Sequence, residues 1–233
     1  ELSEAELKIF NANLLRRQNG EPVAYILREK EFWSLSLEVI ESTLIPRPDT
    51  ELLVETTLDL LPECSQSLLD LGTGTGAIAL ALANERPEWT LLATDKNTEA
   101  VALAENNRRR YQLDNVMVLE SDWFAAVGSG PFHAIVSNPP YINRADKHLS
   151  EGDVRFEPKS ALVADEEGLS DLSHITSGAW PRLLSGGWLL LEHGYQQGAE
   201  VRALLVAQGY IDVETRIDLA GQPRITLGKK PSE

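Results

Sequence analysis

The sequence predicts an α/β protein: a doubly wound, mostly parallel seven-stranded sheet that ends in an antiparallel hairpin and follows the remnant of a small helical domain. Apolar strand-like runs alternate with helical stretches from Ser67 to about residue 208. Repeated strand, helix, strand order implies right-handed crossovers, a parallel sheet and helices on both faces. Only the Asp-Leu-Ala-Gly-Gln-Pro turn at 218–223 separates the last two strands. That turn is too short for a parallel crossover, so the final pair is expected to be antiparallel.

The chain is expected to open with a helix at residues 3–19. Ser3 and Glu6 have capping-box spacing, and Asn19-Gly20 supplies a left-handed stop. A lone helix of this length is marginal in water and needs a partner for its apolar face. The sequence starts at Glu1 rather than at methionine, so we expect residues 1–29 to be what remains of an N-terminal helical domain. Its apolar face is formed by Leu7, Phe10, Leu14 and Leu15.

Residues 30–48 are expected to form a hairpin-like linker between two domains, and residues 49–233 to form the second domain. Apolar residues between Phe32 and Val39 recur with period two, which is typical of strands. Pro46 and Pro48 favour an extended backbone, after which Asp49 or Thr50 can cap a helix that runs to about Leu61.

The second domain follows the alternating pattern to its end. Strands are expected at 67–71, 90–94, 116–119, 132–137, 187–192, 211–218 and 224–229, and helices near 77–86, 98–110, 169–184 and 196–208.

The amino-acid composition disfavours several kinds of binding partner and binding site. The chain has 21 Lys plus Arg against 36 Asp plus Glu, a formal net charge of -15, and such a surface repels polyphosphates. Cys64 is the one cysteine, and we find no apolar run of about 18 residues and no signal segment, which favours the cytoplasm. The four histidines lack ligand spacing, so no metal site is expected. We expect a monomer without stable nucleic-acid or membrane binding.

A glycine-rich loop follows the first strand of the second domain. LLDLGTGTGAIALALA passes from the strand through Gly72, Thr73, Gly74, Thr75 and Gly76 into an alanine-rich helix. Glycines let backbone amides approach a ligand, and the helix N-terminus adds partial positive charge. GTGTGA also fits the G-x-G-x-x-A pattern of nicotinamide-dinucleotide proteins. The loop therefore predicts a nucleotide-like ligand without choosing between cofactors.

Carboxylates and an indole follow the neighbouring strands. Asp95 ends the second strand, where it could accept both ribose hydroxyls or instead cap the helix near Thr98. Asp70 precedes the first glycine and is expected to order the loop through the loop amides. The third strand ends in ESDWF, where Trp123 could stack on an adenine ring and Asp122 could accept from it. Trp123 could also be a core aromatic.

The stretch VSNPPYIN at 136–143 places Asn138 at the end of the fourth strand, beside the predicted reversal of strand order. The side-chain oxygen of Asn138 and the carbonyl of Pro139, held rigid by Pro140, could accept both hydrogens of a planar NH2 group while Tyr141 covers its face. Such an amide nitrogen is a poor nucleophile. Fixed acceptors that stabilise its developing positive charge suit methyl transfer to it.

These motifs together resemble a known family. LDLGTGTGAIAL, Asp95, SDW and NPPY look like class I S-adenosylmethionine-dependent methyltransferases that act on planar nitrogens. EFWSLSL, LIPRPDTE and GDVRFEPKSAL make the chain resemble the HemK/PrmC family within that group. The resemblance implies methyl transfer from S-adenosylmethionine, which becomes S-adenosylhomocysteine, to the side-chain amide of the glutamine in the Gly-Gly-Gln loop of peptide chain release factors. It also implies that the N-terminal helical domain contacts the release factor.

By the same resemblance, the cofactor positions fall on Gly72 through Gly76, Asp95, Trp123 and Asn138. The substrate-amide positions fall on Asn138, Pro139, Pro140 and Tyr141, of which Asn138, Pro139 and Tyr141 would be catalytic. Arg47, Arg155 and Glu157 could either shape the wall of the site or make only structural pairs.

Four other functions remain open. A nucleic-acid adenine or guanine amino methyltransferase could use the same asparagine, although the net charge disfavours it. A ribosomal-protein glutamine methyltransferase shares NPPY, although RPDTE favours the release-factor branch. A nicotinamide-dinucleotide oxidoreductase would use the glycine loop but has no use for NPPY. An inactive binding module would bind the cofactor without turnover.

Overall fold

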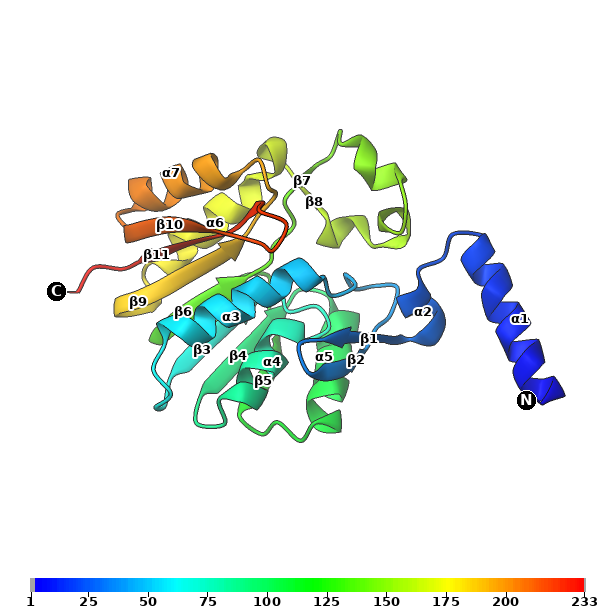
Figure 1. The fold of residues 1–233 in the computed structure, drawn as a ribbon. Helices are drawn as coiled ribbons and strands as arrows, with labels where there is room; N and C mark the ends of the chain where they lie inside the picture. Colours follow the sequence, from blue (N-terminus) through cyan, green and yellow to red (C-terminus); the bar gives the residue numbers. More distant parts are fainter. Residues whose placement is uncertain (1–2, 233) are drawn as a thin grey trace.

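The computed structural model describes residues 3–232, and its centre is a seven-stranded sheet with the order β10-β11-β9-β6-β3-β4-β5 (Figure 1). The pairs β3–β4, β4–β5, β3–β6 and β6–β9 are parallel, whereas β11 pairs antiparallel with both β9 and β10. The predicted fold class is confirmed. The strands are β3 (Ser67–Leu71), β4 (Thr90–Asp95), β5 (Val116–Glu120), β6 (Phe132–Ser137), β9 (Leu183–Glu192), β10 (Ile211–Ile217) and β11 (Pro223–Lys229).

Strand order reverses at β3, because the chain adds β4 and β5 on one side of it and then β6 and β9 on the other. In open parallel sheets ligands bind at the carboxyl ends of the strands beside such a reversal. The carboxyl ends of β3, β4 and β6 are where the glycine loop, Asp95 and Asn138 follow in the sequence. The topology therefore brings these three predicted features to one edge.

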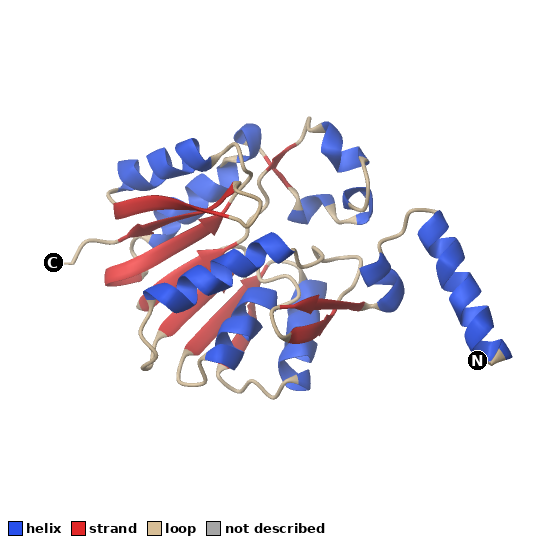
Figure 2. Cartoon of the chain, in the orientation of Figure 1, coloured by secondary structure: helices blue, strands red, loops and turns tan. Residues whose placement is uncertain are grey.

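Helices cover both faces of the sheet (Figure 2). One core joins α3 and α4 to the face that carries Leu68, and the other joins α6 and α7 to the face that carries Leu69 and Leu71. Alternate strand residues point to opposite faces, which explains why neighbouring leucines of one strand belong to different cores. The helices are α3 (Glu51–Leu60), α4 (Ala77–Glu85), α5 (Thr98–Arg110), α6 (Ser170–Ala179) and α7 (Gly198–Gln208).

The predicted helix at 169–184 was too long. The observed helix, α6, ends at Ala179, and β9 begins at Leu183, earlier than the predicted residue 187. Pro181 explains the early stop, because proline lacks a backbone N–H and its ring clashes with a continuing helix. Leu183 then pairs with Phe132, and an irregularity follows before regular pairing with β6 resumes.

The N-terminal segment contains α1 (Glu4–Gln18), α2 (Val23–Leu27) and the hairpin of β1 (Glu29–Phe32) and β2 (Leu35–Glu38). The capping box of Ser3 and Glu6 is confirmed, and Gly20 has the expected left-handed backbone, with φ at +92°. The short helix α2 was not anticipated. Helix α1 projects away from the body of the protein (Figure 1) and buries none of its residues.

The hairpin is built into the core of the second domain. Phe32, Leu35 and Leu37 belong to the same core as α3 and α4. Asn107 of α5 also bonds the backbone of Glu38 in both directions, accepting from its N–H at 2.8 Å and donating to its carbonyl at 3.0 Å.

Residues 142–169 form an irregular segment between β6 and α6, which lies beside the carboxyl edge of the sheet (Figure 1). Its only paired strands in the described part of the chain are β7 (Ile142–Asn143) and β8 (Val163–Ala164), which are parallel.

Among the helices of residues 3–232, none combines the length and apolar character that a membrane span requires.

Candidate active site

A pocket lies at the carboxyl edge of the sheet and holds about 940 Å³, its open mouth included. Its wall includes residues 42–50 ahead of α3, the glycine loop after β3, the turns after β4 and β5, the end of β6, and Ser160 and Ala161 of the irregular segment. The predicted site residues that line it are Gly72, Thr73, Gly74, Thr75, Asp95, Trp123, Asn138 and Pro140. Arg47 lines it as well, and so does Thr50, which was not predicted as a site residue.

The glycine loop turns sharply and is bound to the neighbouring strand. The amides of Gly72 and Thr73 both donate to the carbonyl of Thr94, at 2.9 and 2.8 Å. Gly72, Gly74 and Gly76 all have positive φ, a backbone that residues with a Cβ rarely adopt. A Cβ on Gly74 would meet no atom within 4 Å, so backbone conformation, rather than lack of space, is what requires glycine there.

Asp95 is fixed by two backbone amides. Its Oδ2 accepts from Gly74 at 2.9 Å and its Oδ1 accepts from Asn97 at 2.9 Å. Each carboxylate oxygen has a second lone pair, so the side chain can accept further hydrogen bonds from a ligand. The alternative that Asp95 caps α5 was wrong, because Asn97 is the N-cap and accepts from Glu99.

Asp70 lies beneath the glycine loop and is fully buried. Thr73 Oγ1 donates to its Oδ2 at 2.6 Å, so Asp70 orders the loop through a hydroxyl and not through the loop amides as expected. Its Oδ1 has no hydrogen-bond partner among the described residues. Burial raises the pKa of Asp70 to about 7, against the opposing effect of the Thr73 hydrogen bond.

Trp123 lies between the pocket and the core. Its indole lines the pocket and lies against Gly72, where a Cβ would come within 3.6 Å of the ring. It also packs against the core formed by α6 and α7. Asp122, by contrast, is exposed and does not line the pocket, whereas the preceding Ser121 does.

The NPPY segment divides between the pocket and the interior. Asn138 and Pro140 line the pocket, whereas Pro139 is buried and Tyr141 packs against the α6/α7 core. The Nδ2 group of Asn138 donates to Thr50 Oγ1 at 3.1 Å. With the amide nitrogen engaged by Thr50, the side-chain oxygen of Asn138 remains available as an acceptor.

Sequence reasoning missed two residues that complete this arrangement, Thr50 and Glu192. Glu192 ends β9, and the hydroxyl of Tyr141 donates to its Oε1 at 3.3 Å. Burial raises the pKa of Glu192 to about 7 and also raises the pKa of Tyr141. A signal was present, because GWLLLE closes an apolar strand with a carboxylate, just as LLATD and VSN close theirs with polar side chains.

Arg47 and Glu157 form an ion pair, and Arg47 lines the wall of the pocket. For these two residues, the structure therefore shows a structural pair that also reaches the wall of the site. The side chain of Glu157 is fully buried, and its Oε2 accepts from the amide of Ile45 at 3.1 Å. Burial raises the pKa of Glu157 and the Arg47 guanidinium opposes that shift. Arg155 instead donates to the carbonyl of Asn19 at 3.3 Å, away from the pocket.

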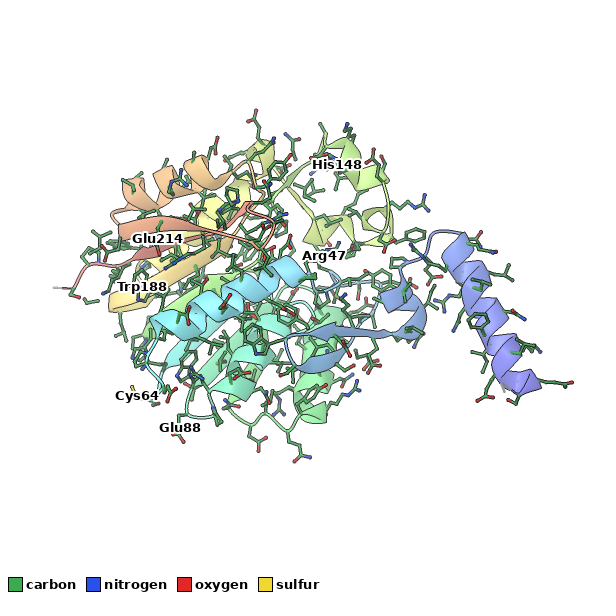
Figure 3. All side chains as sticks on the ribbon, in the orientation of Figure 1. Arg47, Cys64, Glu88, His148, Trp188 and Glu214 are labelled. Atoms are coloured by element: carbon green, nitrogen blue, oxygen red, sulfur yellow. The ribbon has the colours of Figure 1, made fainter. Side chains whose placement is uncertain are left out.

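Figure 3 places Arg47 near the irregular segment at the carboxyl edge and Cys64 at the opposite end of the domain. Cys64 is an exposed loop thiol. His133 accepts from the amide of Ser67 at 2.9 Å, and His193 is buried between Gly194 and Thr226. Within residues 3–232, no three His, Cys, Asp or Glu side chains gather in a group that could hold a metal ion.

Comparison with known proteins agrees with this geometry. The family model of the methyltransferase small domain matches residues 47–154. In structure, the catalytic domain of hMettl16, solved in complex with a MAT2A 3'UTR hairpin, is similar with a TM-score of 0.71 over 92% of this chain and 84% of that chain. Its sequence is only 18% identical, so this likeness concerns the fold alone.

Two curated relatives are much more similar in sequence. The release factor glutamine methyltransferase of Pseudomonas aeruginosa is 62% identical over 220 residues, which cover 94% of this chain and 80% of that protein. That of Escherichia coli (strain K12) is 51% identical over 229 residues, which cover 98% of this chain and 83% of that protein. The chain therefore belongs to the family of the release factor glutamine methyltransferases.

Proposed function

We propose that this protein transfers a methyl group from S-adenosylmethionine to the side-chain amide nitrogen, N5, of the glutamine in the Gly-Gly-Gln loop of peptide chain release factors. The observation that carries the proposal is the orientation of Asn138 at the pocket wall, where its nitrogen is engaged by Thr50 and its oxygen is free to accept. The names of its close relatives support the same substrate. A cytoplasmic location follows from that substrate.

The residues of the pocket fit S-adenosylmethionine, which supplies an electrophilic methyl group when bound. Asp95 is held rigid by two amides and keeps acceptor capacity for ribose hydroxyls. The open space beside Gly74 leaves room for close approach of a ligand to the loop, and the α4 N-terminus favours negative charge. Trp123 offers an aromatic face for the adenine.

Asn138 and Pro139 would bind the glutamine amide. Its nitrogen lone pair is delocalised, so the amide is a weak nucleophile. Acceptors fixed on its two N–H bonds favour the state in which positive charge has developed on nitrogen, since oxygens in place need no reorganisation. The side-chain oxygen of Asn138 and the carbonyl of Pro139 are the acceptors that we assign to this task.

No general base is needed before methyl transfer. The amide nitrogen becomes acidic only as its new bond forms, and it can then release a proton to water. Tyr141 keeps its hydroxyl hydrogen because burial, with the nearby Glu192, raises its pKa. We assign its ring to covering the substrate amide, while its hydroxyl holds the ring to β9.

We assign residues 1–29 to a helical domain that contacts the release factor, residues 30–48 to the hairpin that joins the two parts, and residues 49–233 to the catalytic domain. The exposed apolar side chains of α1 support a contact surface in that segment. They include Leu7, Phe10, Leu14 and Leu15.

A labelling experiment tests the proposed function. The protein is incubated with radiolabelled S-adenosylmethionine and, in parallel, with a release factor, a ribosomal protein fraction or RNA, and the labelled residue is mapped by mass spectrometry. Label on the Gly-Gly-Gln glutamine alone is expected. Label on ribosomal protein or RNA, with none on the release factor, would establish one of the alternative methyltransferase activities instead.

A further inference from the structure

We propose that Thr50 and Glu192 are positioning residues that set the orientation of the Asn138 carboxamide and of Tyr141. Neither residue is among the proposed acceptors of the substrate amide or the proposed cofactor contacts. The inference rests on the proposed function, because it explains why the pocket presents an acceptor, rather than a donor, to a substrate NH2 group.

Three segments that are distant in sequence meet at this point. Thr50 lies just ahead of α3, Asn138 just after β6, and Glu192 at the end of β9. Thr50 Oγ1 accepts from Asn138 Nδ2 at 3.1 Å, across 88 residues of sequence. Glu192 Oε1 accepts from the Tyr141 hydroxyl at 3.3 Å, across 51 residues. The two ends of the NPPY segment are thus tied to different elements of the fold.

Which group donates and which accepts in these hydrogen bonds follows from the number of hydrogens on each group. A threonine hydroxyl has one hydrogen and two lone pairs. Because Thr50 Oγ1 accepts from Asn138, its own hydrogen is free for another acceptor. The carboxylate of Glu192 is the neighbouring candidate, because the Thr50 hydroxyl lies close enough to lower the pKa of Glu192, although no hydrogen bond of ordinary geometry joins these two side chains in residues 3–232.

Glu192 is 1% exposed, and its Oε2 has no hydrogen-bond partner in residues 3–232. Arg224 also favours its charged form, but the ion pairs of that guanidinium are with Asp49 and Asp218, at 3.0 and 3.1 Å. A buried carboxyl group without an ion-pair partner is costly. Its hydrogen bond to Tyr141, the residue that follows the pocket-lining Pro140, is the reason to assign it a functional role.

The consequence concerns Asn138. An asparagine side chain can rotate by half a turn and exchange its oxygen for its NH2 group. In the rotated state it would present a donor to the NH2 of the substrate, and two donors cannot bond each other. Thr50, held by Glu192, would stabilise the productive state.

The test uses two substitutions at one position and a matched control. Thr50→Val removes the hydroxyl while preserving shape, and Thr50→Ser keeps the hydroxyl. Thr57→Val is the control, because Thr57 lies on α3, is fully buried and donates only to the carbonyl of Leu53 at 2.7 Å. Thr50→Val is expected to lower kcat by about tenfold, consistent with loss of one orienting interaction. Thr50→Ser and Thr57→Val should stay within about twofold of the wild-type kcat, and S-adenosylhomocysteine affinity, measured by calorimetry, should change by less than about threefold in all three variants.

A second readout does not depend on turnover. The side-chain NH2 resonances of Asn138, followed by NMR in the free protein, should shift in Thr50→Val and remain near their wild-type positions in Thr57→Val. Glu192→Gln should shift them in the same direction as Thr50→Val, because the new amide can donate toward Thr50. If these resonances do not move in Thr50→Val or Glu192→Gln, or if Thr50→Ser loses as much kcat as Thr50→Val, the positioning role is wrong. If the wild-type protein does not methylate a release factor, the proposed function fails, whereas the NMR result still decides the orientation of Asn138.

Discussion

At the scale of single residues, the pocket owes its chemistry to polar side chains that end parallel strands and are then held by hydrogen bonds. Asp95 ends β4 and Asn138 directly follows β6. The first is fixed by the amides of Gly74 and Asn97, and the second by the hydroxyl of Thr50. Side chains held in this way need little reorganisation when a ligand arrives, which is the condition for efficient electrostatic stabilisation.

Removing the Asn138 acceptor should reduce the rate of the chemical step more than it reduces the affinity for the cofactor. Asn138→Ala is expected to lower kcat by about 10² to 10³, as loss of one fixed transition-state partner does. S-adenosylhomocysteine affinity, measured by calorimetry, should fall less than kcat does. An equal loss in both quantities would mean that Asn138 is mainly a cofactor ligand.

Asp95→Ala tests the ribose contact. The substitution should weaken the binding of S-adenosylmethionine and of S-adenosylhomocysteine to the same degree, because both compounds contain the ribose and differ only at the sulfur. Loss of a charge-assisted hydrogen bond predicts at least about tenfold weaker binding of each. Calorimetric titrations with unchanged affinity for either compound would refute the assignment.

Sequence reasoning found the site residues whose signal is local and missed those whose role depends on long-range packing. The glycine loop, Asp95 and Asn138 are recognisable because each follows a predicted strand. Glu192 also ends a strand, but its burial and its bond to Tyr141 appear only once β9 lies beside β6. Thr50 was predicted only as a possible helix cap, because nothing near it in the sequence indicates Asn138.

At the scale of elements, the ion pair of Arg47 and Glu157 connects the segment ahead of α3 to the irregular segment after β7. Arg47 is the partly exposed member and lines the pocket, whereas the Glu157 side chain is fully buried. Removing the arginine would leave a buried carboxylate without its partner, which is more costly than losing an exposed pair.

Arg47→Ala should therefore lower the free energy of unfolding by about 2 kcal/mol, somewhat below the usual range for a fully buried pair because Arg47 is partly exposed. The matched control is Arg144→Ala, which breaks the exposed pair of Arg144 and Asp165 and should cost less than about 0.5 kcal/mol. Urea denaturation measures both. Equal losses in the two variants would show that Glu157 is not stabilised by Arg47.

The helices and strands that sequence reasoning predicted well are those with clear ends. The capping box of Ser3 and the left-handed Gly20 placed α1 within one residue at each end. The boundary between α6 and β9 was missed because the apolar pattern continues through it, although Pro181 marks the stop. Helix α2 has no side-chain cap, and its five residues are too few for a periodic signal.

At the scale of the whole molecule, two buried carboxyl groups lie near the carboxyl edge of the sheet, one on β3 and one on β9. Burial raises the pKa values of Asp70 and Glu192 to about 7, from 3.8 and 4.5. The folded state then binds their protons more tightly than the unfolded state does. Their neutral forms stabilise the fold fully below about pH 4, and this contribution is lost as the pH rises through 7.

Glu192→Gln should remove one of these pH-dependent contributions. Between pH 5 and 7 the free energy of unfolding of the variant should fall less steeply than that of the wild type, by up to about 1 kcal/mol per pH unit. Glu214→Gln, at an exposed position of β10 (Figure 3), is the control and should keep the wild-type slope. Denaturation curves at pH 5, 6 and 7 give the comparison. Parallel profiles for the wild type and Glu192→Gln would contradict the raised pKa.

The most direct test of the central claim is a crystal structure of the protein with S-adenosylhomocysteine and a release factor that carries the Gly-Gly-Gln loop. We predict that the glutamine NH2 group lies within about 2.7 to 3.2 Å of both Asn138 Oδ1 and the Pro139 carbonyl oxygen, the range of ordinary hydrogen bonds. A glutamine amide bound elsewhere, or an Asn138 that presents its nitrogen to the substrate, would contradict the account.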